Sequence, residues 1–277
     1  ALDGDDLVSL NSHMVLGNAY HLYLRPGVDV ITKLGGLHRF MGWNRSILTD
    51  SGGYQGFSLR HLRRISEDGI LFRSHIDGSS HNLTPEVVIK IQEDLGSDIM
   101  MPLDECAPYN ASELDVEIAV HRTKRWMDRS LSVKSDNRQK LFGIIQGGIF
   151  TEFRQQSVEA LSSFDLPGYA IGGLSVGEPV AVMYDIVEHT TQSLPDDRVR
   201  YLMGTGTPQD LVECVARGVD LYDSVLPTRN ARNGQLLTRE GPLSIKQARF
   251  AEDLRPPDQD CECYTCRRFS RAYLRYL

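Results

Sequence analysis

Seven short apolar segments, each with the length of a buried strand, alternate along this chain with segments that have helical patterns. The apolar segments cover residues 15–22, 47–50, 98–104, 141–146, 168–172, 200–203 and 221–225. Regular alternation of strand and helix is typical of a parallel sheet, because each crossover helix returns the chain to the same end of the sheet. We therefore predict an α/β fold.

The residues at the ends of these segments distinguish two parallel architectures. Nearly every segment ends in a polar residue or a glycine, namely Asn18, Asp50, Asp104, Gln146, Gly173, Gly204 and Asp223. A doubly wound sheet gathers its functional groups at one switch point, whereas a (β/α)8 barrel places them at the carboxyl ends of many strands. The sequence therefore predicts a TIM barrel. Because only seven strands are found and the chain opens just before the first, we expect that an N-terminal segment has been cut away.

Two further parts are expected outside the alternating pattern. Residues 64–77 have the pattern of a hairpin that turns at Asp68-Gly69, which would be an insertion in the barrel. A composition shift at Arg255-Pro256-Pro257 leads into a cysteine cluster. We predict a TIM-barrel domain over residues 1–240 and the beginning of a zinc-binding subdomain over residues 241–277.

The cysteine cluster consists of Cys261, Cys263 and Cys266. Three thiolates within six residues suit tetrahedral zinc, which needs one more ligand. The alternative is a set of free thiols; a disulfide framework is disfavoured because the cysteine count is odd and no secretion signal is visible. No histidine follows Cys266, so we expect the fourth ligand beyond Leu277 and a truncated C-terminal segment.

The charge of the chain is unevenly distributed. The net charge of −7 argues against general affinity for nucleic acids, but residues 224–277 contain ten Lys or Arg and six Asp or Glu. An acidic body with a basic end fits a protein that binds a polyanion at one place, although a solvated basic helix gives the same pattern. No apolar run approaches the ~20 residues of a membrane span, so we expect a cytoplasmic protein.

Asp223 lies in the apolar run 221–226, which we expect to break at Pro227 into a loop with Arg229 and Arg232. An unpaired buried acid is costly, so such a carboxylate is either paired or functional. Beside two guanidinium groups, it could act as a nucleophile or base on a phosphate-bearing substrate. The alternative is an acid that caps its own loop. Asp50 ends a similar apolar run, which favours the functional interpretation.

Seven motifs together resemble the tRNA-guanine transglycosylases in order and spacing. They are DSGGYQ (50–55), DECAPY (104–109), GIIQGG (143–148), GYAIGGLSVGE (168–178), YLMGTGTPQDL (201–211), DSVLPTRNARNG (223–234) and CECYTC (261–266). Members of this family have a TIM barrel with a zinc subdomain and exchange the guanine at wobble position 34 of tRNAs with GUN anticodons for a 7-deazaguanine base.

The resemblance to the bacterial type has further implications for activity and partners. It implies that the incoming base is 7-aminomethyl-7-deazaguanine (preQ1) and that the reaction belongs to queuosine biosynthesis. It also implies an anticodon stem-loop with U33-G34-U35 as the RNA partner, Zn2+ as the metal, and a homodimer. No other cofactor is needed, because one N-glycosidic bond replaces another.

The resemblance also assigns roles to individual residues. Asp223 matches the nucleophile that attacks C1′ of the ribose and forms a covalent intermediate, and Asp50 matches the general acid/base. The residues that would contact the base are Tyr54, Asp104, Cys106, Gln146, Gly173, Leu174, Val176, Glu178 and Met203. The residues that would bind RNA are Arg229, Arg232 and Asn233, and those that would bind zinc are Cys261, Cys263 and Cys266.

Within the base-contacting group, the resemblance separates several tasks. Asp104 and Gln146 would read the purine edge, Gly173 would offer its N–H to the base carbonyl, and the ring would lie between Tyr54 and Met203. The loop 174–178 would face the 7-substituent, with the Leu174 carbonyl accepting from an aminomethyl group and Glu178 supporting that peptide. Val176 occupies the position where enzymes that take queuine have glycine, and Cys106 matches the bacterial pattern. The plainer interpretation of Val176 is ordinary loop packing.

Two other function classes remain as alternatives. A non-catalytic paralogue or partner subunit would bind tRNA without chemistry, but the presence of both Asp50 and Asp223 argues against it. A metal-dependent TIM-barrel hydrolase would hold its metal in the barrel, whereas the cysteine cluster follows the last predicted strand.

Overall fold

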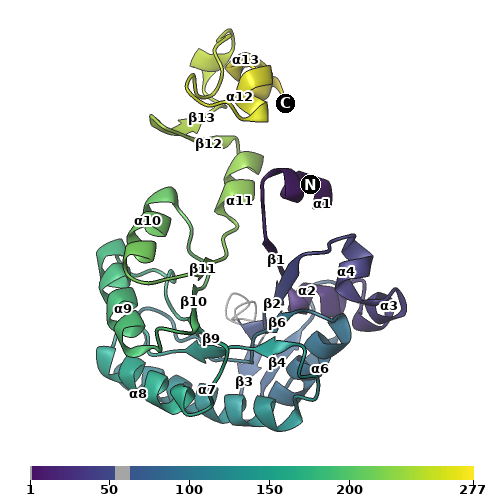
Figure 1. Ribbon diagram of the computed structural model, residues 1–277, viewed down its shortest axis with the longest axis vertical. Coiled ribbons are helices and arrows are strands. Elements are labelled where there is room, and N and C mark those ends of the chain that lie inside the picture. Colours follow the sequence, from purple (N-terminus) through teal and green to yellow (C-terminus); the bar gives the residue numbers. More distant parts are fainter. Residues whose placement is uncertain (1, 54–62) are drawn as a thin grey trace. The chain divides into compact units, whose positions relative to one another are not determined.

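A computed structural model describes residues 2–53 and 63–277 of the chain (Figure 1). The chain divides into two compact units. The barrel unit comprises Ala1–Thr205 and Gln209–Asp223, and the C-terminal unit comprises Gly206–Pro208 and Ser224–Leu277. The domain boundary that we predicted between residues 240 and 241 stays a prediction.

Eight of the described strands of the barrel unit form two parallel four-stranded sheets. The first has the order β1 (Met14–Gly17), β2 (Ser46–Thr49), β6 (Ile99–Met100), β7 (Lys140–Leu141), and the second has the order β11 (Leu221–Tyr222), β10 (Val199–Leu202), β9 (Gly168–Ile171), β8 (Gly143–Ile145). Only Phe142 separates β7 from β8, so the seven strand positions succeed one another in chain order. The predicted TIM-barrel fold is confirmed by this parallel order.

Long helices cover the outside of these sheets (Figure 1). They are α6 (Pro85–Leu95), α7 (Glu113–Val133), α8 (Thr151–Ser162), α9 (Val180–Ser193) and α10 (Pro208–Ala216). The ends of α6 follow directly from its sequence: the Thr84 side chain accepts from Val87 N–H, and Gly96 closes the helix with a φ of 74°. Helix α6 therefore begins after Thr84 and ends at Gly96, as these two residue types favour.

The N-terminal part contains more helix than we predicted. Helix α1 (Gly4–Ser9) precedes β1, and α2 (Ala19–Leu24), α3 (Val28–Lys33) and α4 (Gly36–Met41) connect β1 to β2. The expected strand over residues 15–22 is wrong beyond Gly17, because Asn18 caps α2 by accepting from His21 N–H. A capping asparagine ends the extended segment and begins the helix.

The predicted hairpin is confirmed and is part of a larger antiparallel sheet. Its strands are β3 (Arg63–Ile65), β4 (Ile70–Arg73) and β5 (Ser80–Leu83). Gly69 is required at the turn, because it has a φ of 155° and a Cβ there would lie 2.2 Å from the Leu83 carbonyl oxygen.

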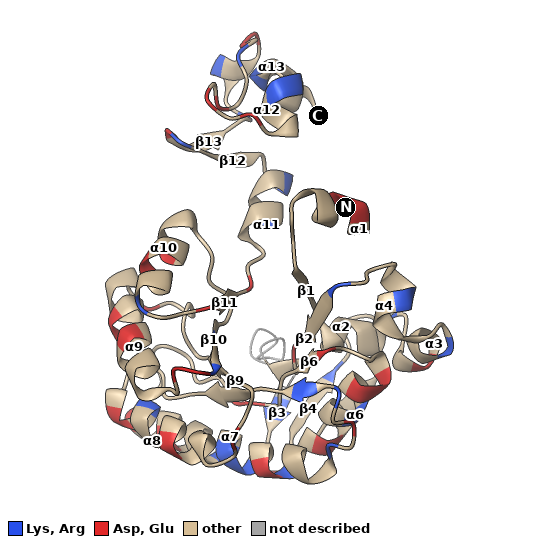
Figure 2. Cartoon of the chain, in the orientation of Figure 1, with Lys and Arg blue, Asp and Glu red and all other residues tan. Residues whose placement is uncertain are grey.

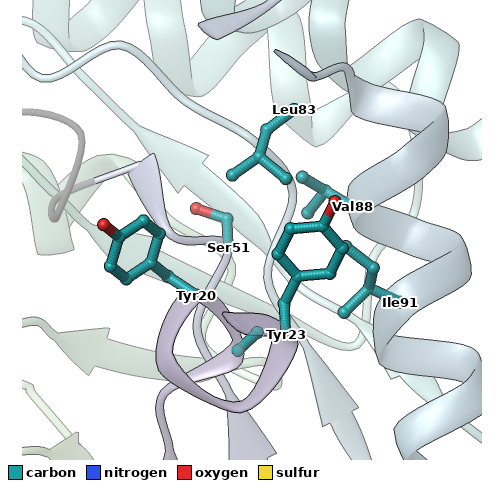
Figure 3. A pocket seen from close by; sticks show the side chains of 7 residues that line it. Tyr20, Tyr23, Ser51, Leu83, Val88 and Ile91 are labelled. Carbon is teal, nitrogen blue, oxygen red and sulfur yellow. The ribbon is translucent and has the colours of Figure 1, made fainter. Parts of the chain in front are cut away.

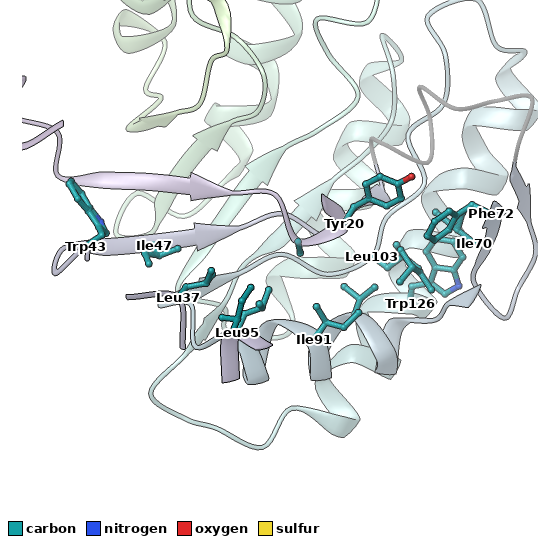
Figure 4. Close-up of a cluster of buried hydrophobic side chains, with 14 residues drawn as sticks. Tyr20, Leu37, Trp43, Ile47, Ile70, Phe72, Ile91, Leu95, Leu103 and Trp126 are labelled. Atoms are coloured by element: carbon teal, nitrogen blue, oxygen red, sulfur yellow. The ribbon is translucent and has the colours of Figure 1, made fainter. Parts of the chain in front are cut away.

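A cluster of buried side chains joins this antiparallel sheet to the first parallel sheet and its helices (Figure 4). Ile47 of β2, Leu95 of α6 and Phe72 of β4 belong to it. Trp126 of α7 has no exposed surface, and its indole N–H donates to the Glu67 carbonyl at 2.8 Å. This contact fixes the hairpin turn to the helix layer.

The C-terminal unit begins with a helix where we expected a loop. Its elements are α11 (Leu226–Arg232), β12 (Gln235–Thr238), β13 (Gly241–Ser244), a 3-10 helix (Ala248–Phe250), α12 (Tyr264–Arg268) and α13 (Arg271–Tyr276). The predicted break at Pro227 is wrong, because Pro227 lies in the first turn of α11. Proline is tolerated there, since the first-turn N–H groups have no partner within the helix. Across the described residues, no helix is long and apolar enough to cross a membrane.

Candidate active site

Asp223 is held by the neighbouring strand. It follows β11, and its Oδ1 accepts from the Tyr201 hydroxyl at 2.6 Å and from Gly204 N–H at 2.8 Å, both at the end of β10. Within the described part of the chain, Oδ2 accepts no hydrogen bond. The carboxylate is therefore fixed through one oxygen while the other is available for a reaction.

Asp50 has the same kind of support at another strand. It follows β2, and its two carboxylate oxygens accept from the Asn18 side-chain amide at 2.7 Å and from Ala19 N–H at 2.8 Å. Both donors come directly after β1, the strand that pairs with β2. Asp50 is thus held from the end of the neighbouring strand.

Tyr201 relates the two acids to each other. Its side chain is buried, and burial, followed by the negative charges of Asp223 and Asp50, raises the pKa of its phenol. Asp223 contacts this phenol directly, whereas Asp50 acts on it only through its charge. Each acid follows a strand of the parallel sheets, Asp50 after β2 and Asp223 after β11. Sequence analysis missed Tyr201, although a hydroxyl in an apolar strand needs a partner and was a usable signal.

Asp104 and Gln146 form a second, buried part of the site. Gln146 Nε2 donates to Asp104 Oδ2 at 2.7 Å, and the Ser51 hydroxyl approaches Asp104 Oδ1 at 3.4 Å. Burial raises the pKa of Asp104 to about 6, although the hydrogen bonds from Gln146 and Ser51 oppose this shift. The Asp104 carboxyl therefore exchanges a proton close to neutral pH.

Two glycines allow the next strand end to approach Gln146. A Cβ on Gly172 would lie 2.8 Å from Gln146 Nε2, and a Cβ on Gly173 would lie 2.4 Å from Gln146 Oε1. The φ of Gly173 is 66°, a conformation that favours glycine. The ends of β2, β6, β8 and β9 therefore bring Ser51, Asp104, Gln146 and the Gly172–Gly173 peptide together.

The loop after Gly173 is organised by Glu178. Its carboxylate accepts from Ser175 N–H and, at 3.0 Å, from Val176 N–H. A trans peptide is planar, so the Leu174 carbonyl points away from the Ser175 N–H that Glu178 binds. The Leu174 carbonyl is therefore directed away from Glu178, and Val176 is half-buried beside it.

The remaining base-site candidates are Cys106, Met203 and Tyr54. Cys106 is buried, and its thiol lies 3.7 Å from the Ala107 carbonyl. Met203 packs against the buried cluster that includes Tyr201 and Met101. Tyr54 lies outside the described residues.

The candidate RNA-binding residues belong to the C-terminal unit. Arg229 and Arg232 are exposed on α11, and Asn233 ends this helix with its side-chain amide donating to the Arg229 carbonyl at 3.0 Å. Figure 2 shows basic residues on α11 and in the α12–α13 region. The C-terminal unit thus carries exposed positive charge of its own.

The three cysteines of the C-terminal unit fit a metal ion. The sulfur atoms of Cys261, Cys263 and Cys266 all lie within 4.8 Å of one another. Tetrahedral zinc with Zn–S bonds of about 2.3 Å places sulfur atoms roughly 3.8 Å apart, which is close to this arrangement. Soft thiolate donors at this spacing suit zinc better than magnesium or calcium.

A small cavity is lined by Ser51 and by residues of α2, β5 and α6 (Figure 3). Its volume is about 10 Å³, and its walls are mostly apolar, with Tyr20, Leu83 and Val88 among the lining residues. This volume holds at most one water molecule. The cavity is therefore too small for a purine.

The sequence matches the family described as Queuine tRNA-ribosyltransferase over residues 1–277. A protein of this name from Caldanaerobacter subterraneus subsp. tengcongensis is 56% identical over 278 aligned residues, covering 100% of this chain and 74% of the relative. Proteins of the same name from Staphylococcus epidermidis and Dehalococcoides mccartyi are each 54% identical, covering 99% and 100% of this chain and 72% and 70% of the relatives.

Proposed function

Because this chain belongs to the queuine tRNA-ribosyltransferase family, we propose that it is a tRNA-guanine transglycosylase, an enzyme that exchanges a base in tRNA. In the finer form of the proposal, it replaces guanine at position 34 of GUN-anticodon tRNAs with preQ1. The RNA would be held on Asp223 between the two half-reactions.

The observation that carries this proposal is the pair of acids around Tyr201. Asp50 and Asp223 have different hydrogen-bond partners, and each is fixed from a neighbouring strand. Exchange with retention of configuration requires two carboxylates with separate roles, as in retaining glycosidases. Among the described residues, Asp223 Oδ2 accepts no hydrogen bond, which suits the nucleophile and leaves Asp50 as the acid and base.

The proposed reaction balances without a redox cofactor. Asp223 Oδ2 forms a bond to C1′, the C1′–N9 bond breaks with its electron pair going to the purine, and Asp50 supplies the proton that the leaving base takes up. In the second half, Asp50 removes a proton from the incoming base, whose nitrogen attacks C1′ and releases Asp223. The Tyr201 hydrogen bond keeps the nucleophile oriented in both steps.

The other candidate residues would bind the two substrates. Asp104, Gln146 and Gly173 would recognise the purine edge, and Leu174 with Glu178 the aminomethyl group. Tyr54, Met203 and Cys106 would complete the base site. Arg229, Arg232 and Asn233 would contact the RNA, whose target base must leave its stack to react.

Zinc on the three cysteines would stabilise the C-terminal unit and take no part in the exchange reaction. The homodimer and a cytoplasmic location remain parts of the proposal.

The direct test is incubation with radiolabelled guanine and an anticodon stem-loop that contains U-G-U. Label that enters the RNA supports the proposal. Tight RNA binding with no incorporation would instead support a non-catalytic tRNA-binding subunit. An RNA in which adenine replaces the target guanine is the matched control.

Guanine recognition should depend on pH through Asp104. The pKa of this buried carboxyl is raised from 3.8 to about 6, so it is neutral below about pH 6 and becomes an acceptor for purine N–H groups above it. We expect the KM for guanine to fall as the pH rises through about 6, and Asp104→Asn to remove this step. The measurement is the pH profile of KM between pH 5 and 8; a step that persists in Asp104→Asn would assign it to another group.

The same shift affects stability with a definite sign. Because the folded pKa lies above the unfolded value, folding favours the protonated carboxyl. The resulting stabilisation is fully present below pH 3.8 and is lost as the pH rises through about 6.

Val176→Gly should admit queuine. In the proposed site, the Val176 side chain fills the space needed by the cyclopentenyl ring, and such overpacking costs about 1 to 3 kcal/mol, or roughly ten- to a hundredfold in discrimination. We expect the unmodified protein to use preQ1 and exclude queuine, Val176→Gly to use both, and Val176→Ala to be intermediate. The measurement is kcat/KM for each base; equal values in the unmodified protein would contradict the steric argument.

A further inference from the structure

Arg154 of α8 is a fully buried charged side chain that binds backbone carbonyls. Its Nε and Nη2 donate to the Gly148 carbonyl at 2.9 and 2.8 Å, and its Nη1 donates to the carbonyls of Ile145 and Gly172 at 2.9 and 2.7 Å. In the described part of the chain it forms no ion pair with a carboxylate. Burying an unpaired guanidinium is costly, which suggests a task beyond packing.

The bond to Gly172 determines the direction of the next N–H group. The Gly172 carbonyl and the Gly173 N–H belong to one peptide, which is trans, since the cis bond found among the described residues is Arg25–Pro26. The two groups of a planar trans peptide point in opposite directions, so the Gly173 N–H points away from Arg154. It has no hydrogen-bond partner among the described residues, and Gly173 lies beside Gln146.

We propose that Arg154 is a positioning residue that aims and polarises the Gly173 N–H for the carbonyl oxygen of the exchanged purine. This inference rests on the proposed function. A charge-assisted hydrogen bond to a peptide carbonyl draws electron density from the peptide and makes its N–H a stronger donor.

The stronger Gly173 N–H donor contributes most to binding the purine carbonyl during the reaction. When the electron pair of the C1′–N9 bond moves into the purine, its carbonyl oxygen becomes more negative. A preorganised donor at that oxygen therefore stabilises the transition state more than the bound substrate. Arg154 stays cationic at neutral pH, since burial lowers its pKa only to about 10.

Glu178 acts on another peptide of the same loop, but with a negative charge where Arg154 has a positive one. It binds Ser175 N–H and thereby turns the Leu174 carbonyl the other way. A cation behind one peptide and an anion behind another give the loop one outward donor and one outward acceptor. This pattern matches a base that carries a carbonyl and an ammonium group.

The effect on the peptide can be measured without any substrate. Protein labelled with carbonyl-13C and 15N glycine gives correlations only for the Gly-Gly pairs 35–36, 52–53, 147–148 and 172–173. In Arg154→Met and Arg154→Lys we expect the Gly172–Gly173 signal to move, with its amide proton upfield, while the 35–36 signal stays. The control is Gln139→Met. Gln139 lies just before β7, and its buried side chain also donates to two backbone carbonyls, those of Gln92 and Ser97.

Base binding by calorimetry supplies the second measurement. Guanine has the carbonyl oxygen and 2-aminopurine lacks it. We expect Arg154→Met to weaken guanine binding about ten- to a hundredfold and 2-aminopurine binding less than about twofold, and Arg154→Lys to restore part of the guanine affinity. Gln139→Met should leave the ratio of the two affinities unchanged.

The outcomes separate this inference from the proposed function. Equal losses for both bases, or an unmoved Gly172–Gly173 signal, would overturn the role of Arg154. A protein that binds guanine with the expected Arg154 dependence but incorporates no label into RNA would refute the exchange activity alone. If Arg154→Met does not fold, Arg154→Lys decides by the same two criteria.

Discussion

Replacing Asp223 with asparagine should abolish guanine exchange and the covalent RNA adduct, with a loss of about four orders of magnitude in rate. The amide oxygen of asparagine can still accept the hydrogen bonds of Tyr201 and Gly204, so the fold should survive. The amide has no nucleophilic carboxylate oxygen, so C1′ cannot be attacked. The measurement is a denaturing gel for the adduct together with single-turnover exchange rates.

A matched control lies at the other end of the same strand. Asp220 precedes β11, and its Oδ2 accepts from Arg200 N–H at 2.9 Å, which is also a bond to β10. Asp220→Asn makes the same chemical change away from the proposed reaction and should keep the adduct. If the adduct forms in Asp223→Asn, the nucleophile assignment is wrong, and Asp50 becomes the first alternative.

Replacing Cys266 with serine should remove the metal from the protein. Serine does not replace a thiolate as a zinc ligand, and two cysteines bind zinc far more weakly than three with a further ligand. We expect about one zinc ion per chain in the unmodified protein and almost none in Cys266→Ser. Metal analysis of protein purified without chelators is the measurement.

The zinc prediction also distinguishes the contributions of the two units to tRNA binding and to guanine binding. Cys261, Cys263 and Cys266 belong to the C-terminal unit, whereas the proposed base-site residues belong to the barrel unit. Loss of zinc should therefore weaken tRNA binding more than guanine binding. The control is Cys214→Ala, which removes a buried thiol of the barrel unit and should retain zinc. Full zinc content in Cys266→Ser would exclude this cysteine as a ligand.

The sequence was most informative where local chemistry and fold agree. Thr84 and Gly96 predict both ends of α6, because capping and left-handed closure are local properties. Asn18 and Pro227 misled us for a related reason. The segment that contains Asn18 was expected to be extended through residue 22, and Pro227 was interpreted as the start of a loop. Asn18 equally suits the cap of a helix, and Pro227 equally suits its first turn.

The candidate site was predictable as a list of residues but not as a set of contacts. Asp50 and Asp223 stand out as acids after apolar runs, yet nothing local indicates that Tyr201 relates them. Arg154 was missed completely, because a basic residue in a helix is usually exposed and its three carbonyl partners are up to 18 residues away. Such contacts depend on how neighbouring strands pack, which spacing alone does not reveal.

The cross-strand support of the two acids has a consequence for synthesis on the ribosome. Asp50 accepts hydrogen bonds from residues at the end of β1, and Asp223 accepts hydrogen bonds from residues of β10 and its end. Each acid therefore has support from the strand made just before its own. A growing chain can therefore set each carboxylate as soon as one strand–helix–strand unit has emerged. Because Asp223 is the last residue of the barrel unit, a nascent chain contains the proposed base-reading groups before it contains the proposed nucleophile.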